Sequence, residues 1–361
     1  MPTPPSDAYR FHAFEVSYFS AKVRPALRYK RLRYDEVRAD VREIQRRTGL
    51  GFVPILVTPE DETWQDSTVI YDRLEARHPD PPLFPPTPLQ CLAAHLVELY
   101  VDEFALLPAM HYRWGSELGE RTARARFGAM MGSVELGDRA AKRMAAARLA
   151  LGATDATAPA IEAHTRDLLD ALSTHFEANA HLLGDRLSFA DCALMGPLYG
   201  HFFNDLVSRR LLLETAIPVV GWIERCNVPD PDHKADWPPD DALSATLLEC
   251  LGVMGRDAVP ILIDGLRAFE DWADGRAADD RRPPRAVGRF ESRLRGLPIE
   301  RFTGAYALWL VQRSLDLYRG LDAGERARVD AALDGTGWEA LLEYRPRHRL
   351  GKDGFELVFE A

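Results

Sequence analysis

The segment FVPILVTPEDETWQDSTVI, residues 52–70, has the clearest local pattern in the chain. Its apolar run VPILVT is typical of a buried strand that begins at a proline, and PEDET is typical of a turn. The polar triplet Gln65-Asp66-Ser67 then precedes apolar helical text, and Asp and Ser are preferred at helix N-termini because their side chains accept hydrogen bonds from free backbone N–H groups. The segment therefore predicts a strand, a turn, one more short strand and a helix that ends before Pro79.

The residues that precede this segment continue the same alternation of strands and helices. Strands are predicted at residues 9–14 (YRFHAF) and 32–36 (LRYDE), and helices at residues 20–31 and 39–47. In the first helix, Val23 and Leu27 are expected to face inward, while Lys22, Arg24 and Arg28 are expected to face water. The first eighty residues thus predict the order βαβαββα.

The remaining chain is predicted to be mostly helical, and a length of 361 residues favours two or three compact units. We expect a unit over residues 1–80, a proline-rich linker over 81–90, an all-helical unit over 91–226 and a mostly helical extension over 227–361. The final FELVFE is predicted to be a terminal strand. The predicted fold class is α+β.

Composition and charge exclude several classes of function. The net charge of −10 argues against a general nucleic-acid binder, because neutralising phosphates requires a basic surface. The first eighty residues hold 13 basic and 13 acidic side chains, so an anionic small molecule would meet least repulsion there. The four cysteines lie far apart, without zinc-ligand spacing, and no metal site is expected. The N-terminus has no apolar signal core and no apolar run is long enough to cross a bilayer, so we expect a cytoplasmic protein without a membrane partner.

Four motifs share an order that resembles the glutathione S-transferase superfamily. They are the Ser-x-x-Ser-x-Lys-Val-Arg junction at residues 17–24, FVPIL at 52–56, QDSTVI at 65–70 and LGDRLSFAD at 183–191. The resemblance covers about residues 8–226. It implies a thioredoxin-like first domain, an all-helical second domain, glutathione as co-substrate, a small electrophile as second substrate and a possible homodimer.

The resemblance also implies roles for residues of the opening segment. A cis bond between Val53 and Pro54 would present the backbone of Val53 to the cysteinyl unit of glutathione, as an added strand is held. Ser67 would receive the γ-glutamyl carboxylate at a helix N-terminus, Asp66 would pair with the γ-glutamyl ammonium, and Gln65 would assist. The alternative interpretations are a trans proline at a strand start and a plain helix cap.

The thiol of glutathione must be ionised, and a hydroxyl donor at a helix N-terminus stabilises a thiolate. This chain has Ser20 where thiol-type relatives carry cysteine, and Ser17 where serine-type relatives carry their hydroxyl. We rank Ser17 first as thiolate stabiliser, Ser20 second and Tyr18 third. The alternative is that the two serines only cap the helix.

Aromatic residues at the start of the helical unit are candidates for an apolar substrate pocket. They are Phe104, His111, Tyr112 and Trp114. The same helical spacing also fits a plain core, and a single histidine fits a hydrogen-bonded structural role. Ser188-Phe189-Ala190-Asp191 has the pattern of a capping box, so Asp191 is expected to be structural.

The sequence therefore predicts a glutathione transferase-like enzyme. Conjugation, dehalogenation, isomerisation and peroxidase chemistry all start from the same thiolate, and the sequence does not choose among them. The alternative is a non-catalytic glutathione- or protein-binding scaffold that keeps the fold. The enzyme hypothesis also requires that the corner formed by Asp66 and Ser67 is not filled by the protein's own tail.

Overall fold

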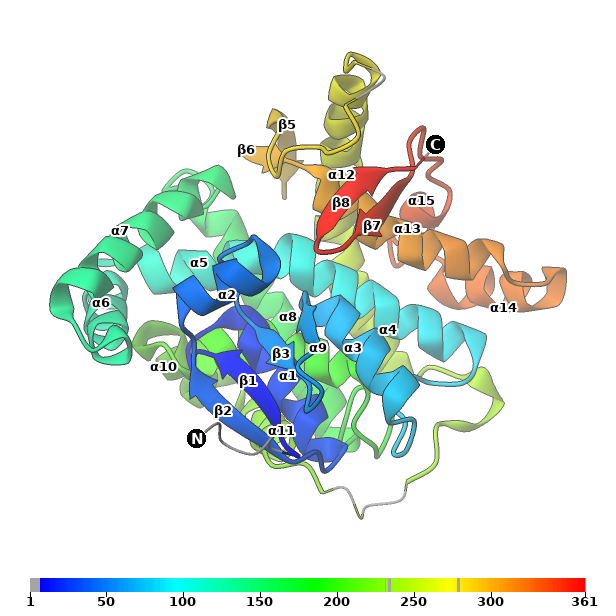
Figure 1. The fold of residues 1–361 in the computed structure, drawn as a ribbon. Coiled ribbons are helices and arrows are strands. Elements are labelled where there is room, and N and C mark those ends of the chain that lie inside the picture. The colour runs from blue at the N-terminus through cyan, green and yellow to red at the C-terminus, as the bar shows by residue number, and fades with distance from the viewer. Residues whose placement is uncertain (1–6, 231, 233–234, 278–279, 361) are drawn as a thin grey trace.

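The computed structural model describes residues 7–230, 232, 235–277 and 280–360. The first part of the chain folds as a mixed sheet with helices, in the predicted order βαβαββα. The elements are β1 (Tyr9–Ala13), α1 (Tyr18–Tyr29), β2 (Tyr34–Arg38), α2 (Val41–Thr48), β3 (Ile55–Val57), β4 (Thr63–Gln65) and α3 (Ser67–Arg77). The predicted thioredoxin-like class of this part is confirmed (Figure 1).

The sheet has the strand order β2-β1-β3-β4. β1 and β2 are parallel, β3 runs antiparallel to β1, and β4 runs antiparallel to β3. Phe11 and Leu56 are fully buried and directly opposite each other, so the hydrophobic alternation fixes the register. Each buried strand also contributes to one core that continues into the helical part.

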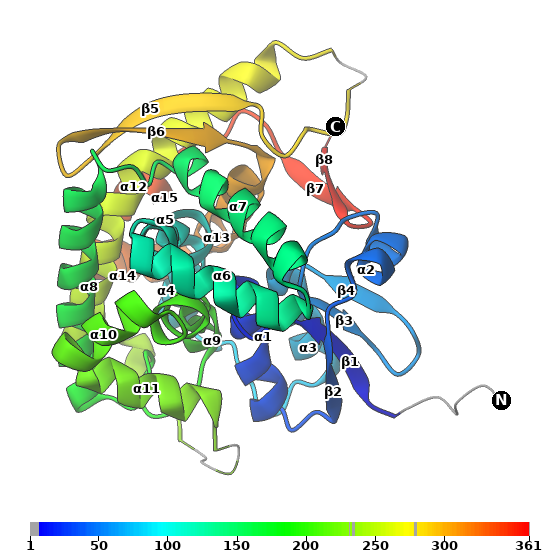
Figure 2. The same ribbon diagram turned by 90° about the vertical axis from the view of Figure 1, so that its left-hand side faces the viewer.

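Helix α1 differs from its predicted amphipathic pattern. Val23 and Leu27 are buried as expected, but Lys22 and Arg24 are buried too, with 0% and 1% exposure. The prediction that these two side chains face water was wrong. The helical part of the chain packs on α1 (Figure 2) and supplies the partner of Lys22, whereas Arg24 lies toward the sheet, over the ring of Phe11 in β1. Each is compensated by carboxylates: Lys22 by Asp102, and Arg24 by a two-bond contact with Glu36.

The second part of the chain is helical, as predicted. Its elements are α4 (Pro88–Tyr100), the π-helical η1 (Val101–Ala105), α5 (Leu106–Trp114), α6 (Glu117–Met131), α7 (Val134–Ala150), α8 (Ala158–Ala178), α9 (Phe189–Pro197), the π-helical η2 (Leu198–Phe203), α10 (Leu206–Thr215) and α11 (Ile217–Asn227). The side chain of Asp191 accepts hydrogen bonds from the backbone N–H of Ser188 and of Leu182 and from Trp222 Nε1. The capping box is present and its aspartate lies at the centre of a buried polar cluster.

The C-terminal extension contains more β-structure than the sequence predicted. Its elements are the 3₁₀ turn η3 (Pro239–Asp241), α12 (Ala245–Asp274), β5 (Gly288–Leu294), β6 (Leu297–Thr303), α13 (Ala305–Arg319), α14 (Ala323–Leu333), α15 (Glu339–Leu342), β7 (Leu350–Asp353) and β8 (Glu356–Phe359). The terminal strand is confirmed as β8. Two hairpins, β5–β6 and β7–β8, were not predicted, and α12 is a single helix of 30 residues.

The extension packs along the helices that follow the sheet. α12 lies against α8 and α4, while α13 and α14 lie along α4. The β7–β8 hairpin projects from α13 toward the side of the molecule where α2 and β3 lie (Figures 1 and 2). The extension therefore reaches the domain that carries the predicted glutathione site. None of the helices among the described residues has the length and apolar character required to cross a bilayer.

Candidate functional site

Strand register brings the predicted site residues to one end of the sheet. His12 of β1 lies opposite Ile55 of β3, and Ile55 lies opposite Gln65 of β4. The chain leaving β1, the chain entering β3 and the chain leaving β4 therefore meet at the same end. These three segments carry Ser17, Val53 and Ser67, respectively.

Ser17 is the N-cap of α1, and its Oγ accepts a hydrogen bond from the backbone N–H of Ser20 at 3.3 Å. No described residue accepts the hydroxyl proton of Ser17, which is half-buried, so this proton is free to be donated. Ser20 is fully buried and its Oγ accepts from Phe14 N–H at 3.4 Å. Of the two serines, only Ser17 combines a free donor with partial exposure.

Tyr18 is buried, and its hydroxyl donates to the carbonyl oxygen of Val101 at 2.7 Å. Burial raises the pKa of Tyr18 well above its ordinary value, and the carboxylate of Asp102 raises it further. Gly196 of α9 allows this packing, because a Cβ there would lie 3.0 Å from the tyrosine ring and 2.9 Å from Cγ of Lys22. Tyr18 therefore joins α1 to the helical part, and we do not carry it forward as a thiol donor.

The turn before β3 has the backbone arrangement that the resemblance implied. The peptide bond between Val53 and Pro54 is cis. Neither the N–H nor the C=O of Val53 makes a hydrogen bond with a described residue. Gln65 Nε2 donates to the carbonyl of Phe52 at 3.0 Å, while its Oε1 is buried without a partner among described residues. Gln65 thus supports the turn from within the protein.

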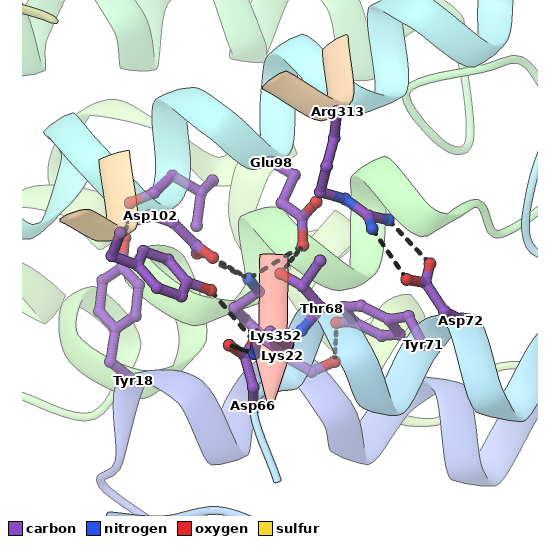
Figure 3. A network of polar contacts seen from close by, with 12 residues as sticks. Tyr18, Lys22, Asp66, Thr68, Tyr71, Asp72, Glu98, Asp102, Arg313 and Lys352 are labelled. Carbon is purple, nitrogen blue, oxygen red and sulfur yellow. Dashed lines mark hydrogen bonds and ion pairs between the residues drawn. The ribbon is translucent and has the colours of Figure 1, made fainter. Parts of the chain in front are cut away.

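The corner formed by Asp66 and Ser67 is covered by the C-terminal extension. Lys352 Nζ lies 2.6 Å from Asp66 Oδ2 (Figure 3). The hydroxyl of Tyr306 donates to Asp66 Oδ1 at 3.0 Å. The N–H of Thr68 also donates to Oδ1, at 3.0 Å, which makes Asp66 the N-cap of α3. Both carboxylate oxygens are therefore engaged. The open corner that the enzyme hypothesis requires is absent at Asp66 in this structure, and glutathione could pair with Asp66 only by displacing Lys352.

Ser67 is covered without being hydrogen-bonded. It is 3% exposed, yet neither its N–H nor its hydroxyl makes a hydrogen bond with a described residue. It is the first residue of α3, where the free N–H groups and the helix dipole favour an anion. Ser67 is thus unpaired among the described residues, while both carboxylate oxygens of Asp66 are engaged.

A buried charge network lies beneath this corner. Lys22 Nζ is 2.6 and 2.8 Å from the two oxygens of Asp102 and 3.5 Å from Glu98 Oε1. Thr68 Oγ1 donates to the same oxygen of Glu98 at 2.7 Å, so the network extends from α1 through α4 to α3 (Figure 3). Burial lowers the pKa of Lys22, but the two carboxylates outweigh burial and raise it above its usual value, which keeps the ammonium charged.

The predicted substrate residues take mainly structural positions. Phe104 is buried against Tyr100, and Trp114 is buried against Phe127 in a separate small cluster. His111 Nε2 lies 3.1 Å from a carboxylate oxygen of Glu162. Phe104, His111 and Trp114 are buried, whereas Tyr112 is half-buried against Phe202. Tyr112 keeps the largest share of exposed surface among them.

Sequence reasoning missed the residues that the extension contributes to the site. Besides Lys352 and Tyr306, Arg313 of α13 makes a two-bond ion pair with Asp72 of α3, at 2.9 and 2.8 Å. The guanidinium of Arg285 lies 3.5 Å from the ring centroid of Phe52. Nothing local in the sequence distinguishes these residues from surface arginines, lysines and tyrosines.

One group of side chains outside the site has ligand-type atoms close together. His181 Nδ1 lies 3.7 Å from Asp191 Oδ1 and 3.7 Å from Cys226 Sγ. The Asp191 oxygen already accepts two hydrogen bonds, and burial raises the pKa of the Cys226 thiol well above its usual value. A protonated thiol is a poor metal ligand, so we interpret this trio as a structural hydrogen-bonded cluster.

Comparison with known proteins gives matches in the N-terminal and helical parts. Residues 11–82 match the model of the glutathione S-transferase N-terminal domain, and residues 140–228 match that of the glutathione S-transferase C-terminal domain. No curated protein matches the chain.

Similar solved structures include three bacterial proteins. A glutathione S-transferase from Rhodospirillum rubrum F11 is 19% identical over 64% of this chain and 96% of that chain, with a TM-score of 0.41. FzlA from C. crescentus is 21% identical over 66% and 97%, with a TM-score of 0.42. A glutathione S-transferase from Methylobacterium radiotolerans JCM 2831, in complex with glutathione sulfonate, is 22% identical over 65% and 100%, with a TM-score of 0.38. From the two domain matches, we conclude that this chain carries the N-terminal and C-terminal domains of the glutathione S-transferase superfamily, followed by an additional C-terminal region.

Proposed function

We propose that this chain binds glutathione at the end of the sheet that carries Ser17, Val53 and Ser67, and ionises its thiol for attack on a small, apolar electrophile. The observation that carries the proposal is the unpaired state of these three residues. Strand register brings together a free hydroxyl proton on Ser17, a free backbone pair on Val53 and a free helix N-terminus at Ser67. A thiolate, an extended peptide and a carboxylate are the groups that such donors and acceptors recognise.

The role of Ser17 follows from its donor capacity. A hydroxyl that donates to a thiolate stabilises the charged form and lowers the thiol pKa. A hydrogen bond to a charged group contributes about 1.5–3 kcal/mol, which corresponds to about 1–2 pKa units. Ser17 is therefore proposed as the residue that contacts the thiol, and Tyr112 is proposed as the residue that contacts the electrophile.

A homodimer, which the resemblance implies, remains a prediction that sedimentation will check.

Calorimetry with glutathione and a pH titration of the bound thiolate by ultraviolet absorbance test the proposal. Ser17→Ala is expected to raise the thiol pKa of bound glutathione by about 1–2 units. Ser20→Ala is the matched control, because Ser20 is also a serine of α1 but is fully buried, and it should leave the titration unchanged. An unchanged titration in Ser17→Ala would remove Ser17 from this role.

A second candidate function is a non-catalytic scaffold that retains the fold. The ion pair between Lys352 and Asp66 favours it, because the protein itself occupies the carboxylate that the ammonium of glutathione would need. The two candidates differ in turnover: the scaffold hypothesis predicts that no electrophile is converted, whether or not calorimetry detects glutathione binding. Binding followed by turnover of an electrophile would exclude it.

A further inference from the structure

The ion pair at Asp66 has the same chemistry as the contact expected from a ligand. Lys352 presents a primary ammonium to Asp66 Oδ2 at 2.6 Å, and the side chains of the pair are only 18% and 15% exposed. The other oxygen, Oδ1, accepts from Tyr306 and from the N–H of Thr68. A second ammonium cannot share Asp66 with Lys352, since the carboxylate oxygens are engaged and two adjacent cations repel.

Lys352 is held in place by the fold of the extension. Gln312 of α13 clamps the start of β7 from both directions: its Nε2 donates to the carbonyl of Leu350 and its Oε1 accepts from Leu350 N–H, each at 2.9 Å. α13 is itself fixed to α3 by the ion pair between Arg313 and Asp72. The β7–β8 hairpin is therefore held by α13, and α13 is fixed to α3, the helix that Asp66 caps.

The ammonium of Lys352 has two partners, Asp66 and Trp309. The ammonium lies 4.3 Å from the ring centroid of Trp309, which adds a cation–π contact to the ion pair. Asp66 is the described residue that forms a salt bridge with Lys352, whereas Asp353 and Glu356 of the same hairpin pair with Arg282. Asp66 in turn holds a positive φ of 79°, a strained conformation for a residue other than glycine and one found most often at functional sites.

We propose that Lys352 is a built-in occupant of the ammonium position at Asp66, so that the β7–β8 hairpin and the amino group of a ligand compete for the same carboxylate. This inference rests on the proposed function, since it concerns the same site. It also defines a ligand class. A thiol ligand whose acidic end has a carboxylate but no amine can use Ser67 without displacing Lys352, whereas glutathione must displace it.

The experiment is a comparison of two ligands and two proteins by calorimetry. The ligands are glutathione and its analogue glutaryl-cysteinyl-glycine, in which hydrogen replaces the γ-glutamyl amine. The proteins are the native chain and Lys352→Met, a change that keeps an unbranched side chain of similar length and removes the charge. Lys352→Gln serves as a second variant, and the urea midpoint confirms that each variant is folded.

The competition predicts an effect on one ligand only. Lys352→Met should bind glutathione at least tenfold more tightly than the native chain, while the affinity for the analogue should change less than twofold. Arg313→Met is the matched control, because it removes the other ion pair between the extension and α3 but leaves Asp66 paired. It should not change the ratio of the two affinities.

The possible outcomes separate this inference from the proposed function. Glutathione binding by Lys352→Met but not by the native chain would uphold the inference and remove the glutathione-dependent activity from the native chain. Equal glutathione affinities of both proteins would overturn the inference and leave the proposed function in place. An equal gain for both ligands would also overturn it, because the hairpin would then act as a simple cover. Absence of binding to any of the proteins would overturn both.

Discussion

Replacement of Lys22 by methionine is predicted to have the largest effect on stability among the changes considered. The lysine side chain is 0% exposed and its ammonium lies between Asp102 and Glu98, at 2.6 and 3.5 Å. Methionine fills a similar volume but leaves two buried carboxylates without a cation. Removing one partner of a buried ion pair typically costs about 3–5 kcal/mol, because the remaining charge is buried and uncompensated.

The cost should depend on pH, and the direction follows from Asp102. Burial raises the pKa of Asp102, and the ammonium of Lys22 opposes that increase. Without Lys22, the folded-state pKa of Asp102 rises further above its unfolded value. A carboxyl with a raised folded pKa binds more protons in the folded state, so stability falls as pH rises from the unfolded pKa to the folded one. The difference between Lys22→Met and the native chain should therefore be larger at pH 8 than at pH 5.

Urea denaturation at both pH values measures the effect. The expected loss is about 3–5 kcal/mol at pH 8. The double variant Lys22→Met, Asp102→Leu should recover a large part of it, because an apolar pair replaces the charges. Arg73→Met is the control: it removes an exposed ion pair with Glu62 and should cost no more than about 1 kcal/mol. A loss for Lys22→Met as small as that of the control, or one that is equal at both pH values, would refute the reasoning.

Three further predictions concern other parts of the fold. Gly137→Ala should destabilise the chain by about 1–3 kcal/mol in urea, because the new Cβ would lie 2.4 Å from Gly128 Cα. The control Gly128→Ala should be tolerated, because its Cβ would meet nothing closer than 3.6 Å. Equal effects of the two changes would contradict the close contact of α6 and α7. Burial alone raises the pKa of Asp191, but hydrogen bonds from His181 and Ser188 and its other contacts outweigh burial and hold the pKa below its ordinary value. Asp191→Asn should therefore lower the free energy of unfolding by about 1.5–3 kcal/mol at pH 7, and this loss should shrink as pH falls below about 4. Urea midpoints at the two pH values check this. Tyr18→Phe should cost about 1 kcal/mol through the lost bond to Val101 and leave the thiolate titration unchanged, and a shifted titration would restore Tyr18 as a thiol donor.

Features of local origin were predictable from the sequence. The order βαβαββα follows from apolar periodicity, turn residues and helix caps, all of which act over a few neighbouring positions. The cap at Asp66, the cap at Ser17 and the capping box at Ser188 are present where the pattern predicted them. The resemblance then added the arrangement of these local motifs in space.

Features that depend on packing were not predictable in this way. Lys22 has the sequence signature of an exposed helical lysine, but it is buried because α9 packs on its side of α1. Its carboxylate partners, Glu98 and Asp102, come from α4 and η1. The β5–β6 and β7–β8 hairpins also escaped prediction, since short strands of mixed polarity resemble loops until a partner strand pairs with them.

The occupation of Asp66 by the C-terminal extension also depends on packing and was not predictable from local sequence patterns. The sequence by itself determined that Asp66 and Ser67 begin a helix and offer an acceptor and free N–H groups. Only the tertiary structure decided that the acceptor is filled, by Tyr306 and Lys352 from 240 and 286 residues away. The physical reason is that a cap depends on residues within one turn of a helix, whereas an ion pair of this kind depends on where α13 and the β7–β8 hairpin pack against the rest of the chain.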